Sequence, residues 1–156
     1  MTGHAALIAR IWENLGEIER IVNRADMLSK KAHQTNDDGY WDGVALNLHG
    51  FYSGVERIFE DIGRSLDGGV PAGPDWHASL LTQMSAEIPG ERPPIIQRQT
   101  RICLDEYRGF RHVVRNVYAF NFRPERLEEL IDRLGPCHEA VTQDLEDFIK
   151  FLTALV

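Results

Sequence analysis

One segment of the chain concentrates side chains that could bind a phosphate and move a proton. Arg111 is followed directly by His112, with Arg108 three residues before and Arg115 four residues after. Arginine can hold a phosphate through two parallel hydrogen bonds, and histidine can transfer a proton near neutral pH. On a helix with about 100° per residue, these four side chains fall within about 100° of one another. The spacing predicts a polar wedge (Arg108, Arg111, His112, Arg115) with the chemistry of a phosphate site.

The charge of the chain is divided unevenly around this wedge. Residues 98–126 hold seven arginines and three acidic residues, a net charge of +4, whereas the whole chain has a net charge of −7. The remainder therefore carries −11. A basic helix face with so many acids elsewhere is also typical of a solvated surface or an internal ion-pair site. The balance disfavours a general nucleic-acid coat but permits a focused RNA-binding cleft.

The elements that must position the wedge are helices. Apolar residues recur every three or four positions along most of the chain, and alternation with period two is hard to find. We expect Gly135 and Pro136 to end a helix. Four long and two short helices predict an all-α bundle that forms a single domain over residues 1–156. The expected helices cover residues 4–32, 40–66, 76–86, 95–118, 124–134 and 137–155.

Composition narrows the class of protein further. Hydrophobic residues make up 43% of the chain and charged residues 26%, an ordinary globular balance that excludes a disordered tail or a collagen-like repeat. No run approaches the roughly 18–20 apolar residues of a membrane helix, and the first residues do not resemble a secretory signal. Cys103 and Cys137 are too few for a disulfide framework and fit no metal motif. We expect a soluble, reduced, cytoplasmic protein without a metal or cofactor.

Further candidate residues lie outside the wedge. His49, Tyr52 and Glu56 are spaced to share one face of the second helix, where a carboxylate could pair with an arginine of the wedge or orient a catalytic group. The alternative is a buried polar network that fixes helix packing. His77, beside Trp76, could line the same cleft, or it could be a solvated histidine next to a packing tryptophan.

The octapeptide Arg111-His112-Val113-Val114-Arg115-Asn116-Val117-Tyr118 resembles the signature of the HEPN superfamily. In HepT-type ribonuclease toxins that signature reads Arg, four residues, His, one residue, Tyr. Arg111 and Tyr118 match it, and Asn116 stands at the position of the histidine. The resemblance extends over most of the chain, residues 7–155, and is also carried by residues 47–59, 75–77 and 110–118.

The resemblance implies a metal-independent endoribonuclease toxin of HEPN-like fold. It further implies a homodimer or higher oligomer, in which two copies of the motif face each other across a cleft and the RNA 2′-hydroxyl attacks the adjacent phosphate. Arg111 would hold that phosphate. Tyr118 would be the residue to which a cognate minimal nucleotidyltransferase, an MntA-like antitoxin, adds AMP.

Asn116 departs from the family pattern and leaves three outcomes open. An asparagine cannot carry a proton at neutral pH. His112, about 40° away on the helix, could take over proton transfer, which is the outcome we favour slightly, although it could also be a surface histidine without a role. Asn116 could instead orient the phosphate in a slower enzyme. In the third outcome the chain is an inactive helical adaptor that binds RNA or a nucleotidyltransferase without cleavage.

Overall fold

The computed structural model describes the backbone of residues 3–116 and 123–155, and the side chains of this range except for residues 112–116. An isolated bridge between Ile88 and Arg92 is the sole β-type pairing among these residues. The predicted all-α class is confirmed. The described helices are α1 (Ala5–Thr35), α2 (Gly39–Leu66), α3 (Trp76–Ser85), α4 (Arg98–Asn116) and α5 (Pro124–Ala154).

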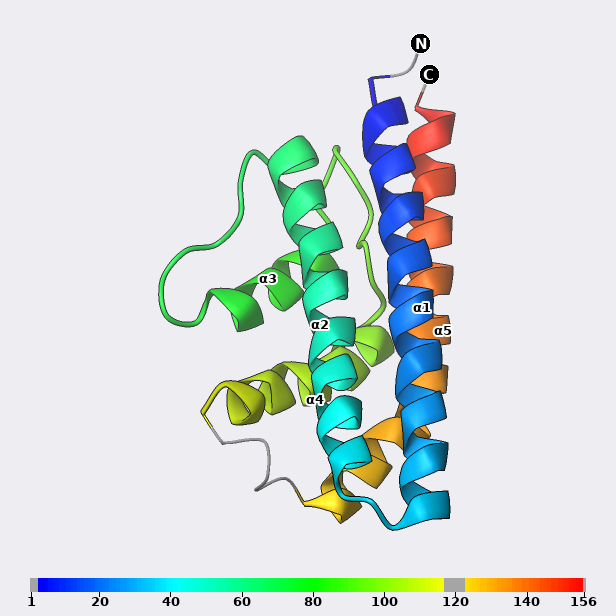
Figure 1. Ribbon diagram of the computed structural model, residues 1–156. Coiled ribbons are helices and arrows are strands. Elements are labelled where there is room, and N and C mark those ends of the chain that lie inside the picture. The colour runs from blue at the N-terminus through cyan, green and yellow to red at the C-terminus, as the bar shows by residue number, and fades with distance from the viewer. Residues whose placement is uncertain (1–2, 117–122, 156) are drawn as a thin grey trace.

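Helix α2 is the centre of the arrangement, because it packs against each of the other four helices. Figure 1 shows α1 and α5 running side by side, with the start of α1 next to the end of α5. Helices α3 and α4 lie on the other side of α2 and cross it steeply. The helix that carries the wedge is therefore held against α2, α3 and α5 rather than against α1.

The apolar face of α2 explains its central place. Phe51, Val55, Ile58 and Phe59 recur at helical spacing and are fully buried, which stabilises the fold by roughly 1.5–3 kcal/mol for each side chain. On the side toward α1, a Cβ at Gly54 would lie 2.9 Å from Ile18 Cγ1, so only glycine permits this close approach of the two helices.

Helix α4 is fastened to α5 at several points. Asp144 Oδ2 accepts hydrogen bonds from the Gln97 backbone N–H at 2.8 Å and from Thr100 Oγ1 at 2.7 Å. Farther along, the buried Tyr107 hydroxyl donates to the Leu130 carbonyl at 2.6 Å. These contacts fix how α4 lies on the bundle and so where its later residues can reach.

The cysteines supply one more link between these two helices, and here the expectation of a reduced chain is wrong. Cys103 of α4 and Cys137 of α5 form a disulfide, with Cα atoms 5.9 Å apart. Closing a loop of this length lowers the entropy of the unfolded chain and is worth about 3–4 kcal/mol. The sequence shows too few cysteines for a framework, but a single pair across two packed helices needs no framework.

The expectation that Gly135 and Pro136 end a helix is also wrong, since α5 continues through both residues to Ala154. Two expected helices are thus one. Pro136 cannot donate to the carbonyl four residues earlier, which costs about 3 kcal/mol and typically kinks a helix. In Figure 1 the first part of α5 runs obliquely to the rest. Burial of apolar side chains at unbroken helical spacing offsets the cost: Leu127, Leu130, Leu134, Cys137, Val141 and Leu145.

A buried ion pair anchors the connection between α3 and α4 to the end of α2. Both nitrogens of one edge of the Arg92 guanidinium donate to the Asp67 carboxylate, Nε at 2.8 Å and Nη2 at 2.7 Å. The Arg92 side chain is 3% exposed and that of Asp67 is 4% exposed. Burial alone would raise the pKa of Asp67, but hydrogen bonds from Arg92 and Gln83 and the charge of Arg92 outweigh it and lower the pKa.

None of the described helices is long and apolar enough to span a membrane.

We predict that Asp67→Asn lowers the free energy of unfolding at pH 7 by about 3–5 kcal/mol, because it leaves a buried arginine without its counter-charge. The lowered pKa means that Asp67 stabilises the fold above its ordinary value of 3.8 and ceases to do so as the pH falls through the lowered value. Urea unfolding should therefore show the difference between variant and wild type shrinking below pH 3.8. The control is Asp61→Asn, which breaks the solvent-exposed pair with Arg10 and should change little. Equal effects of the two variants at pH 7 would contradict this account.

Candidate functional site

The arginine of the motif reaches from α4 across to α3. Arg111 Nη1 lies 2.7 Å from Nε2 of His77 and 3.2 Å from Nδ1 of the same ring. Two residues that are 34 positions apart in the sequence are thus in direct contact. His77 was expected to line the cleft or to be solvated, and its side chain is 19% exposed.

His77 in turn contacts a buried carboxylate of α2. Its Nδ1 lies 2.6 Å from Oε2 of Glu56, whose side chain is 5% exposed. Nδ1 cannot donate to Glu56 and accept from Arg111 at the same time. Nδ1–H therefore donates to Glu56, which leaves the lone pair on Nε2, the ring nitrogen closer to Arg111 Nη1. The three residues form a chain, Glu56–His77–Arg111, that joins α2, α3 and α4.

The start of α3 presents His77 at this place. The Trp76 indole stacks on the His77 imidazole, with ring centroids 3.6 Å apart and planes inclined by 33°. Trp76 is half-buried and packs on the hydrophobic core. The ring of His77 is therefore held between an indole, a carboxylate and a guanidinium, which fixes its orientation.

Tyr52 adds a fourth residue to the Glu56–His77–Arg111 contacts and lies on α2, one turn before Glu56. Burial first, and then the charge of Glu56 and a hydrogen bond with it, raise the pKa of Tyr52 far above the ordinary value of 10.0. Tyr52 is 1% exposed, and the raised pKa keeps its hydroxyl protonated and able to donate to the carboxylate. Tyr52 and Glu56 thus belong to a buried polar network that reaches an arginine of the wedge through His77. His49, on the same helix, is half-buried.

Arg111 and Arg108 of the wedge differ in the groups that contact their guanidinium. Among the described residues, no carboxylate lies within ion-pair distance of the Arg111 guanidinium, and its buried Nε finds no acceptor. Arg108, by contrast, donates from Nε to Asp105 of its own helix at 2.7 Å. The hydrogen bond with Asp105, together with the charge of Asp105, outweighs burial and raises the pKa of Arg108.

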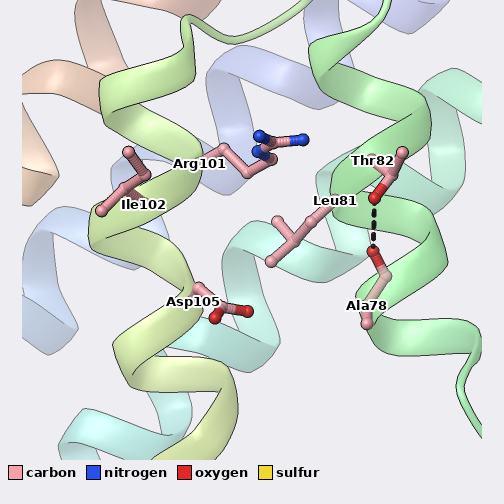
Figure 2. A pocket seen from close by; sticks show the side chains of 6 residues that line it. All are labelled: Ala78, Leu81, Thr82, Arg101, Ile102 and Asp105. Atoms are coloured by element: carbon pink, nitrogen blue, oxygen red, sulfur yellow. Dashed lines mark hydrogen bonds between the residues drawn. The ribbon is translucent and has the colours of Figure 1, made fainter.

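A hollow of about 310 Å³ lies next to this network, between α3 and α4. Figure 2 shows Arg101 reaching from α4 toward α3 over Leu81, with Asp105 one turn farther along α4. Arg101 Nη1 lies 3.4 Å from Ser85 Oγ. Sequence reasoning did not select Arg101 as a site residue, although its spacing of seven positions before Arg108 places both on one helix face. The hollow is lined by Ala78, Leu81, Thr82, Arg101, Ile102 and Asp105.

The remaining motif residues are described in part or not at all. His112, Arg115 and Asn116 lie on the last turns of α4, and their side chains are outside those that the structure describes. Tyr118 lies outside the described residues. In the part of the chain that is described, no group of three or more His, Cys, Asp or Glu side chains could hold a metal ion.

Comparison with known proteins gives one match. Residues 43–152 match a family model described as HepT-like protein. The matched range covers more than two thirds of the chain and includes Glu56, His77 and Arg111. No curated protein and no solved structure matches the chain.

We predict that Tyr52→Phe lowers the free energy of unfolding by about 1–2 kcal/mol, since it removes a donor from the buried Glu56 carboxylate. Thermal unfolding of the purified chain measures the change. Tyr40→Phe, at the half-buried start of α2, is the matched control and should have a smaller effect. If Tyr52→Phe is as stable as wild type, the hydrogen bond to Glu56 contributes nothing.

Proposed function

The chain belongs to the family of HepT-like proteins, and we propose that it is a metal-independent endoribonuclease toxin. In this proposal the 2′-hydroxyl of RNA attacks the adjacent phosphate within a cleft between two copies of the chain. The observation that carries the proposal is the state of Arg111. This arginine of the motif is fixed by His77, yet no carboxylate of the described residues lies within ion-pair distance of it.

A guanidinium that is already oriented and has no carboxylate partner can stabilise the phosphate in the transition state. Negative charge grows on the phosphate oxygens as the 2′-oxygen attacks, and a cation that is already oriented stabilises this charge without further reorganisation. Arg111 offers N–H donors in a planar fork, and the contact with His77 engages Nη1. The buried Nε has no acceptor among the described residues, and such an unpaired donor costs about 1–3 kcal/mol until an acceptor reaches it.

The other residues of the motif have subsidiary roles in this proposal. Arg115 and Arg108 contact neighbouring phosphates, and Asn116 orients the scissile one. Because Arg108 is paired with Asp105, its share of binding is smaller than that of Arg111. Tyr118 is the residue to which an MntA-like nucleotidyltransferase antitoxin adds AMP, which would silence the toxin in the cytoplasm.

The hollow between α3 and α4 supports a path for the RNA beside the cut. It begins next to His77 at Ala78 and continues along α4 to Arg101. Ten residues of helix separate Arg101 from Arg111, a rise of about 15 Å at 1.5 Å per residue. That length accommodates a neighbouring nucleotide, with the Arg101 guanidinium available to its phosphate.

Asn116 supports a second candidate function. Without a histidine at this position, the chain could be a catalytically inactive adaptor that binds a nucleotidyltransferase or RNA without cutting. Formation of a tight complex with a neighbour-encoded nucleotidyltransferase, together with intact RNA at every pH, would favour this candidate.

We predict that the purified chain degrades tRNA or mRNA in the presence of EDTA and that Arg111→Ala lowers the rate by about 10²–10³-fold, the usual effect of removing one transition-state donor. Gel analysis of end-labelled RNA measures the rate. Arg64→Ala is the matched control, because Arg64 is an exposed arginine of α2 paired with Glu60. RNA that stays intact with wild-type protein, with and without EDTA, would refute the ribonuclease and favour the adaptor.

A further inference from the structure

The contact between His77 and Arg111 brings an imidazole to the place where a proton must move. A general base has to lie within hydrogen-bond reach of the proton it removes, at about 2.6–3.2 Å between heavy atoms. The attacking 2′-hydroxyl is next to the phosphate that Arg111 would hold, and His77 Nε2 is 2.7 Å from Arg111 Nη1. We infer that His77, rather than His112, is the base that accepts the 2′-hydroxyl proton; this inference rests on the proposed ribonuclease function.

Glu56 gives His77 the tautomer that a base needs. Because Nδ1–H donates to the Glu56 carboxylate at 2.6 Å, the lone pair of the ring is on Nε2, the nitrogen that lies 2.7 Å from Arg111 Nη1. When Nη1 of Arg111 turns to a phosphate oxygen, Nε2 becomes free to accept a proton. Glu56 then stabilises the imidazolium that forms, in the way that a buried carboxylate supports a catalytic histidine.

The charged groups around His77 come from three helices. Glu56 faces it from α2, with the Tyr52 hydroxyl behind the carboxylate. Arg111 faces it from α4. Asp75 precedes it by two residues, and Asp75 lies near enough to Arg108 for their charges to interact.

The step balances in the following way. The 2′-hydroxyl proton moves to Nε2 of His77, the 2′-oxygen forms a bond to phosphorus, and the bond from phosphorus to the 5′-oxygen breaks. The leaving 5′-oxygen takes a proton from water. The products are a 2′,3′-cyclic phosphate and a 5′-hydroxyl, and the imidazolium returns its proton to water. The reaction requires neutral His77, so the rate falls at acidic pH.

The test compares His77→Asn with wild type on one RNA oligonucleotide over a range of pH. We expect kcat to fall by about 10²–10⁴-fold, the usual contribution of a general base, and the acid limb of the pH profile to disappear. Binding of the same oligonucleotide with 2′-O-methyl groups throughout, which cannot be cut, should stay within a few-fold of wild type. That binding also shows that the variant is folded.

Two further variants separate proton transfer from a structural role. Glu56→Gln removes the anion that favours the imidazolium, so the acid limb should move to lower pH. His33→Asn is the matched control, since His33 of α1 forms a surface pair with Glu128 of α5, and its loss should leave rate and pH profile unchanged.

The outcomes distinguish this inference from the function on which it rests. Wild-type protein that cuts no RNA overturns both. Wild-type protein that cuts RNA, while His77→Asn keeps kcat within about tenfold and retains the acid limb, overturns the role of His77 alone. Loss of the acid limb in His112→Asn, with the limb kept in His77→Asn, also overturns it and assigns the proton to His112.

Discussion

The site depends on one buried carboxylate. Glu56 lies among apolar side chains of α2, the helix that packs against all the others, and a charge there is costly unless it is hydrogen-bonded. His77 and Tyr52 meet that need from two sides. The contact with His77 brings α3 onto α2, and through His77 it also sets where Arg111 of α4 can lie. One desolvated charge therefore couples the packing of three helices to the position of the arginine that matters for function.

The rest of the fold fixes the positions of these three helices relative to one another. The buried Arg92–Asp67 pair fastens the connection between α3 and α4 to the end of α2. The disulfide between Cys103 and Cys137 ties α4 to α5, two turns of helix before Arg111. Rigid elements of this kind hold a functional side chain more precisely than a loop does. Arg111 can then keep a geometry suited to a phosphate even though its charge has no direct carboxylate partner among the described residues.

Much of the fold was predictable from the sequence, and the predictions that were wrong have clear physical causes. Helical spacing of apolar residues correctly predicted α2 and its buried face, and the shared face of Tyr52 and Glu56. Local propensity disfavours proline inside a helix and so wrongly predicts that the helix ends at Pro136, whereas the unbroken spacing of Leu134, Cys137 and Val141 across it is the stronger signal. The disulfide and the contact of His77 with Arg111 depend on tertiary packing over 34 residues, which local patterns do not encode.

In the proposed mechanism the RNA 2′-hydroxyl is the nucleophile, Arg111 holds the phosphate and His77 is the base. Mass spectrometry of the fragments cut by wild-type protein tests this most directly. Fragments that end in a 2′,3′-cyclic phosphate, or its hydrolysis product, and that begin with a 5′-hydroxyl agree with the account. Fragments that carry a 3′-hydroxyl and a 5′-phosphate would contradict it, because attack by the 2′-oxygen cannot produce them.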